Sequence, residues 1–206
     1  GELRRYAFFG HLIDALDGFD KLGGWAIPFH NEQGERLVFK RPVVVEKLRW
    51  RRSMCTEEFV YLRARTTRPS KVTLISSQQA AAYYDPEKST GAYPTRDAYL
   101  ADIVDLTRRE VAELVALGCT YIQIDAPNYA QWHIDPGNRA AFEAHGHDMA
   151  HELVADAEFD SMVFEGLTGV TRAMHMCRGN APGGMWAATG GYEAISKDVF
   201  PRLTNL

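Results

Sequence analysis

The sequence predicts an α/β fold, arranged as part of a (β/α)8 TIM barrel, and three observations support this interpretation. Long segments with apolar residues at helical spacing alternate with short apolar runs of strand length, which is typical of βα units around a parallel sheet. Polar and reactive residues stand where the strand-like runs end, as they do at the carboxyl ends of barrel strands. No Gly-x-Gly-x-x-Gly follows a strand-like run, so a dinucleotide-binding open sheet is the weaker alternative.

Length, charge and cysteine content narrow the class of protein. The chain has 206 residues, 46% of them apolar, and a formal net charge of −4. This length favours one domain over residues 1–206, and the mild charge gives no reason to expect nucleic acid or a membrane as partner. Cys55, Cys119 and Cys177 are too widely spaced for a disulfide framework, so a cytoplasmic protein is expected. The sequence leaves a homo-oligomer open.

The first quarter of the chain is expected to contain one helix and three short strands. Residues 6–16 carry apolar side chains at helical spacing, and Asp17-Gly18 is expected to end that helix. Residues 24–29 and 36–39 are candidates for a hairpin, and residues 43–45 form a short apolar strand candidate.

The next segments predict one helix and one strand. Residues 56–66 favour a helix because Thr56 can cap it and two glutamates follow in the first turn. Residues 72–76 form an apolar run of strand length.

The clearest βα pattern lies in the middle of the chain. Thr95 precedes a long amphipathic helix over residues 96–117, and Gly118 is expected to end it. Residues 120–124 then predict a strand that finishes at Asp125.

The last third predicts a helix over residues 136–159, a strand over residues 170–176 and helical structure over residues 191–203. The chain starts without methionine and stops where a further strand is expected. We therefore expect a piece of a barrel that lacks the first strand and the last strands.

His175 and Cys177 are candidate metal ligands. Residues i and i+2 of a strand point to the same side, so imidazole and thiolate can be presented to one point, and zinc prefers this pair of donors. Two ligands do not complete a zinc site, which needs three or four. The structural alternative is two buried residues at the end of a strand.

Two carboxylates are candidates for binding a substrate. Asp125 closes an apolar strand, where it can bind a substrate amine, although a helix cap or a loop ion pair explains it equally well. Glu2 precedes the first expected helix, and the helix dipole alone is sufficient reason for a carboxylate there. His145, His147 and His151 are interpreted as a solvated helix face, because the Glu of His-Glu-x-x-His is absent.

Three motifs, in order and at similar spacing, resemble the cobalamin-independent methionine synthase family. Residues 121–127 read Tyr-Ile-Gln-Ile-Asp-Ala-Pro, which is similar to the family's Ile-Gln-Ile-Asp-Glu-Pro strand. His175-Met176-Cys177 resembles the family's His-Met-Cys, and Gly1-Glu2 with its following residues resembles the family's Gly-Glu segment. The resemblance covers nearly the whole chain.

The resemblance implies a (β/α)8 barrel in which a zinc-bound thiol is the nucleophile. His175 and Cys177 would be zinc ligands, while Asp125 and Glu2 would hold the amino group of homocysteine. The family's remaining ligands, a Glu and a second Cys, have no counterpart before residue 206. The implied partners are a small thiol substrate and a methyl donor, such as 5-methyltetrahydrofolate.

The part of the sequence that corresponds to the folate site departs from the family pattern. Gln131 stands where a folate-contacting Glu is expected, Ala126 replaces the Glu of Asp-Glu-Pro, and Tyr83 or Tyr84 takes the place of a Trp. Methyl or alkyl transfer to a thiol is therefore favoured over methionine synthesis in the strict sense. The alternatives are alkyl transfer to another thiol such as coenzyme M, a metal-free barrel resembling uroporphyrinogen decarboxylase, and a non-catalytic remnant.

Overall fold

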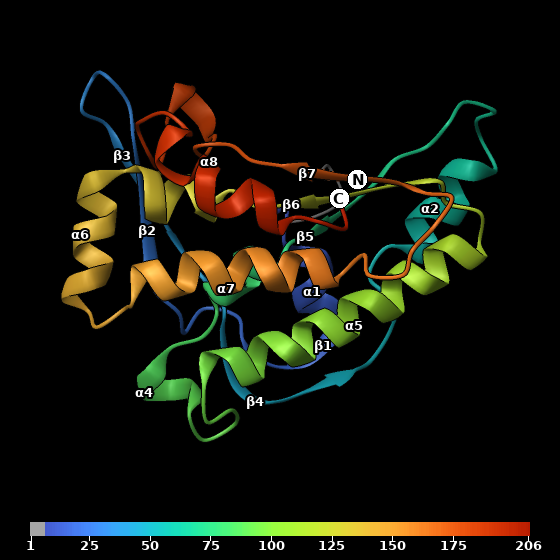
Figure 1. Ribbon diagram of the computed structural model, residues 1–206, viewed down its shortest axis with the longest axis horizontal. Helices are drawn as coiled ribbons and strands as arrows, with labels where there is room; N and C mark the ends of the chain where they lie inside the picture. The colour runs from blue at the N-terminus through green and yellow to red at the C-terminus, as the bar shows by residue number, and fades with distance from the viewer. Residues whose placement is uncertain (1–6) are drawn as a thin grey trace.

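The computed structural model describes residues 7–206, which form helices packed against three small sheets (Figure 1). The strands are β1 (Leu16–Asp20), β2 (Ala26–His30), β3 (Arg36–Lys40), β4 (Val43–Trp50), β5 (Val72–Ile75), β6 (Tyr121–Asp125) and β7 (Thr171–His175). The α-helices are α1 (Gly10–Ala15), α2 (Thr56–Arg63), α3 (Ser77–Ala81), α4 (Pro86–Ser89), α5 (Arg96–Ala116), α6 (Pro136–Ala144), α7 (Met149–Met162) and α8 (Glu193–Val199). A π-helix, η2 (Tyr129–Ile134), and the 3-10 turns η3 (Pro182–Gly184) and η4 (Phe200–Arg202) complete the described elements. No described helix is both long and apolar enough to cross a membrane.

The parallel sheet expected from the alternating pattern is present in the order β5-β6-β7. Its register places Ile75 opposite Asp125 on one side and His175 opposite Asp125 on the other. Leu74 and Ile124 are buried in the main core together with residues of α5. Figure 1 shows α5 and α7 running beside one another along this sheet. The carboxyl ends of the strands are therefore brought to one edge.

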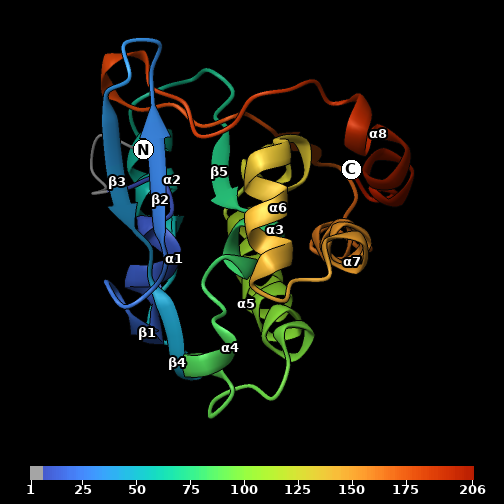
Figure 2. The ribbon, with the colours of Figure 1, turned by 90° about the vertical axis from the view of Figure 1, so that its left-hand side faces the viewer.

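The N-terminal part of the chain does not continue the parallel sheet. β4, which includes the strand expected at residues 43–45, pairs antiparallel with β1, and β2 pairs antiparallel with β3 as the expected hairpin. Figure 2 shows β1 to β4 on one side of β5, with α6, α7 and α8 on the other. Residues 7–206 thus form an α/β arrangement, as the sequence predicts, with small sheets and no closed barrel.

Asp17 and Gly18, expected to end the first helix, lie inside strand β1. The helix within the described residues covers only Gly10–Ala15. Gly18 has φ of +114°, and the register with β4 shifts between Asp17 and Phe19, which marks a β-bulge. A Cβ on Gly18 would lie 2.9 Å from the carbonyl oxygen of Glu46. The dipeptide therefore bends a strand, because only glycine adopts this φ without strain.

The helix expected over residues 136–159 is divided into α6 and α7. Gly146 has φ of +86°, which ends the first helix. Asp148 then begins the second helix, because its side chain accepts a hydrogen bond from the backbone N–H of His151 at 3.0 Å. In contrast, α5 agrees with expectation, with the Thr95 side chain capping its start. The C-terminal segment is also shorter than expected, since α8 ends at Val199 and a 3-10 turn follows.

Gly18→Ala should destabilise the protein by about 1–3 kcal/mol, because alanine is strained at this φ and its Cβ meets the β4 backbone. Chemical denaturation of both proteins measures the difference. Gly91→Ala is the matched control, since a Cβ there meets nothing within 4 Å. Equal loss of stability in both variants would contradict the assigned role of Gly18.

Candidate functional site

A cleft of about 420 Å³ opens at the carboxyl ends of β6 and β7. It brings together three residues that the sequence singled out, Asp125, His175 and Cys177. The other lining residues are Phe8, Phe29, Pro127, Gln131, Gly179 and Asn180. Glu2, the fourth predicted residue, lies outside the described residues.

Asp125 is 9% exposed and is held by its own strand. Gln123, two residues earlier and on the same face, donates its Nε2–H to Asp125 Oδ1 at 2.6 Å. Lys71 Nζ in turn donates to Gln123 Oε1 at 2.9 Å. The Asp125 backbone oxygen also accepts from Ser76 N–H at 3.1 Å. Asp125 does not cap the following helix, whose N-cap is Asn128, and it lines the cleft.

His175 and Cys177 follow from the end of β7. His175 is exposed, Cys177 is half-buried with a free thiol, and both line the cleft, although β7 ends at His175 and Cys177 lies in the loop beyond it. The backbone oxygen of His175 accepts from Ala126 N–H at 2.8 Å, which joins the loops after β6 and β7. Within residues 7–206, no group of three or more His, Cys, Asp or Glu side chains is placed to hold a metal ion.

The predicted histidine cluster does not form one helix face. His145 and His151 are exposed, as expected for a solvated surface. His147 instead precedes α7, packs edge-on against Trp25 and donates its Nδ1–H to Glu152 Oε1 at 2.9 Å. The interpretation of His147 as a solvated helical residue is therefore wrong, because Gly146 breaks the helix before it.

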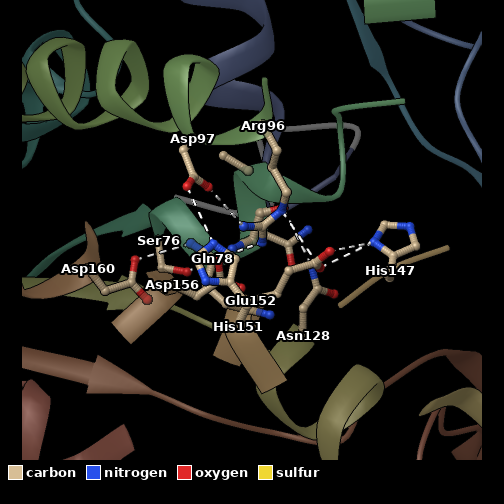
Figure 3. Close-up of polar contacts among 12 residues, drawn as sticks. Ser76, Gln78, Arg96, Asp97, Asn128, His147, His151, Glu152, Asp156 and Asp160 are labelled. Atoms are coloured by element: carbon tan, nitrogen blue, oxygen red, sulfur yellow. Dashed lines mark hydrogen bonds and ion pairs between the residues drawn. The ribbon is translucent and has the colours of Figure 1, made fainter. Parts of the chain in front are cut away.

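Sequence reasoning missed a buried polar network beneath the loops that follow β5 and β6 (Figure 3). Asp160 of α7 accepts from the backbone N–H of Gln78 at 3.1 Å and from the hydroxyl of Tyr129 at 2.9 Å. One turn earlier, Asp156 forms an ion pair with Arg96. The network connects α7 with α3, α5 and η2. Sequence reasoning missed it because Asp156 and Asp160 stand in a segment whose apolar spacing predicts a helix and does not show that these two side chains are buried.

Burial decides the ionisation of this network. Burial and, after it, the neighbouring charge of Asp156 together raise the pKa of Asp160 to about 7. Burial also raises the pKa of Asp156 to about 6, although the Arg96 guanidinium opposes the shift. For Glu152, burial acts in the same direction, but the hydrogen bond with His147 and the charge of Arg96 outweigh it and lower the pKa. Burial lowers the pKa of His133 to about 4.

Asp160→Asn should change how stability depends on pH. The folded-state pKa of Asp160 is about 7 against a usual value of 3.8, so between these values the native state binds more protons than the unfolded state. Stability from this group is greatest below about pH 4 and falls as pH rises towards 7. Relative to the non-titrating variant, the free energy of unfolding of the wild type should fall by on the order of 2–4 kcal/mol as the pH rises from about 4 to about 7.

Urea denaturation at a series of pH values tests this expectation. Asp105→Asn, on the exposed side of α5, is the matched control. A stability difference between wild type and Asp160→Asn that stays constant from pH 4 to pH 7 would show that Asp160 is not held protonated by burial.

Comparisons with known proteins find relatives of low sequence identity, among them methionine synthases. No protein-family model matches it. The Bacillus subtilis protein YxjH is 24% identical over 206 residues, which are 98% of this chain and 53% of YxjH. The methionine synthase of Pyrococcus abyssi is 25% identical over 127 residues, which are 62% of this chain and 35% of that enzyme. The chain thus spans about half the length of the first relative and a third of the second.

Solved structures show the same similarity at the level of the fold. A B12-independent methionine synthase from a Shewanella species, solved with selenomethionine, superposes with a TM-score of 0.61 at 22% identity, over 89% of this chain and 47% of that one. A putative vitamin-B12 independent methionine synthase from Listeria monocytogenes superposes with a TM-score of 0.66 at 16% identity, over 99% and 52%. The chain has an α/β fold similar to parts of these methionine synthases.

Proposed function

We propose that this chain carries part of the active site of a methyltransferase that moves a methyl group to a thiol, with homocysteine as the acceptor. The observation that carries the proposal is the shared cleft of Asp125, His175 and Cys177. A carboxylate, an imidazole and a thiol line this cleft at the carboxyl ends of neighbouring parallel strands, where barrel enzymes perform their chemistry. The similarity to methionine synthases supports the same reaction class.

Asp125 is the residue proposed to recognise the acceptor. A nearly buried carboxylate that Gln123 holds in one orientation can accept a charge-assisted hydrogen bond from a substrate ammonium group. This favours an amino-acid thiol over coenzyme M, which carries a negative sulfonate and no amine. Glu2 is proposed to join Asp125 at the amino group.

His175 and Cys177 are proposed to bind zinc. Their donor atoms, an imidazole nitrogen and a thiol sulfur, are those that zinc prefers, and both face one cleft. Two donors fit half of a four-ligand site, so further ligands would come from outside the described residues. Bound zinc would favour the thiolate form of the substrate at neutral pH. The methyl donor is proposed to be 5-methyltetrahydrofolate or another compound with an activated methyl group.

Cys177→Ser should weaken zinc binding by at least about tenfold, or about 1.4 kcal/mol, because a neutral hydroxyl is a poor zinc ligand. Competition against a chromophoric chelator measures the affinity. Cys119→Ala is the matched control, since Cys119 is buried at the opposite end of β6. Equal zinc affinity in wild type and Cys177→Ser would reject the metal site, and no zinc binding by the wild type would favour a metal-free decarboxylase-like reading.

Asp125→Asn should weaken homocysteine binding by about 1.5–3 kcal/mol, the usual range for a hydrogen bond to a charged group. Isothermal titration calorimetry of both proteins gives the difference. The ligand control is 4-mercaptobutyrate, which has the same chain and thiol but lacks the amine. It should bind the wild type and the variant equally, and a parallel loss for both ligands would show that Asp125 does not hold the amine.

A further inference from the structure

A second pocket, here called the aromatic pocket, lies between the β2–β3 hairpin, α3 and α6. Its volume is about 220 Å³, and six of its sixteen lining residues carry aromatic rings. The residues that define it are Trp25, Ala26, Ile27, Pro28, Arg41, Ala81, Ala82, Tyr84, Gln131, Trp132, Asn138, Ala141, Phe142, His145, His147 and Ala187. It shares Gln131 with the Asp125 cleft and no other lining residue.

Arg41 is the feature of this pocket that needs an explanation. It is only 5% exposed, and its terminal nitrogen donates to Asn128 Oδ1 and Gln131 Oε1, both at 3.1 Å. Both acceptors are neutral amide oxygens. Within residues 7–206, no carboxylate acts on the charge of Arg41, and its enclosed Nε–H has no hydrogen-bond acceptor. A buried cation with an unsatisfied donor is costly unless an anion joins it.

Burial does not remove this charge. It lowers the pKa of Arg41 to about 10, so the guanidinium stays protonated at neutral pH. The backbone also fixes its position, because Arg41 N–H donates to the Trp25 oxygen and Gly24 N–H donates to the Arg41 oxygen. A Cβ on Gly24 would lie 2.6 Å from that oxygen. The hairpin base therefore closes tightly and holds a cation at the pocket wall.

The remaining walls favour a flat ligand. Trp25 stacks on Phe142 with ring centroids 5.8 Å apart and planes 6° apart, and Trp132 contacts Phe142 at 4.9 Å. The Arg41 guanidinium carbon lies 5.6 Å from the centre of the Trp132 ring. Aromatic surfaces of this kind prefer planar partners. A cavity smaller than the roughly 300 Å³ at which drug-sized sites begin suits a single ring.

We propose that the aromatic pocket binds a monocyclic aromatic carboxylate, whose carboxylate pairs with the Arg41 guanidinium while its ring lies among Trp25, Trp132 and Phe142. Paired with an arginine donor, a carboxylate forms a charge-assisted hydrogen bond that a neutral ligand cannot match. The proposal goes beyond the zinc and homocysteine sites, because it concerns a different cavity and none of the residues proposed to bind those groups, although Tyr84 and Gln131 of its lining belong to the segments that the resemblance matches to the methyl-donor site.

Benzoate and benzamide are the probes that test this proposal by isothermal titration calorimetry. They have nearly the same shape and differ in charge, so the wild type should bind benzoate at least about tenfold more tightly. Arg41→Gln should reduce benzoate affinity to that of benzamide. Arg36→Gln, an exposed arginine on the same hairpin, is the matched control and should retain the preference.

The Arg41 Nε–H resonance of the wild-type protein gives a readout that needs no variant. It should shift on addition of benzoate and stay in place on addition of benzamide. If Arg41→Gln does not fold, the test relies on the wild-type protein, through its preference for benzoate over benzamide and the shift of its Arg41 resonance. Equal affinity for both probes, no benzoate binding in the millimolar range, or an unchanged Arg41 signal at saturation would each overturn the proposal.

Discussion

The parallel pairing of β6 with its two neighbours is the constraint on which the candidate site depends. The register sets Asp125 between Ile75 and His175, so a carboxylate and an imidazole reach the same edge. Because side chains alternate between the two faces, a slip of one residue would move Asp125 into the core and Ile124 into the cleft. Cys177, two residues beyond the end of β7, lines the same cleft. The burial of Leu74 and Ile124 in the core opposes such a slip.

The polar network of α7 supports the loops that this register brings together. Asp160 binds the start of α3 and the hydroxyl of Tyr129, so one carboxyl group fixes the segments after β5 and β6. Asp156 attaches the same helix to Arg96 at the start of α5. Asp156 and Asp160 are buried, and burial raises the pKa of both. They hold the loops in place, but they lower the stability of the folded protein near neutral pH. Such a cost is common where a scaffold must hold loops for function.

Gln131 separates two cavities of opposite electrostatic character. On one side lies the Asp125 carboxylate, which suits a cationic group, and on the other lies the Arg41 guanidinium, which suits an anion. The Gln131 amide oxygen accepts from Arg41 and leaves the positive charge uncompensated. A glutamate at this position would pair with Arg41 and change the selectivity of both cavities. The neutral side chain therefore keeps the two electrostatic environments distinct.

The sequence by itself determined the helices and strands with strong local signals and the residues that gather at the strand ends. Thr95 and Gly118 bound α5, and the strands at residues 121–125 and 171–175 end in Asp125 and His175, which line the cleft together with Cys177 of the following loop. Only the tertiary structure decided that Gly18 bends a strand instead of ending a helix, because the partner strand β4 supplies the competing hydrogen bonds. It also decided that Arg41 and Asp160 are buried, since burial depends on elements that are far apart in the sequence. Local propensity describes a segment alone, whereas pairing and burial are properties of segments that meet.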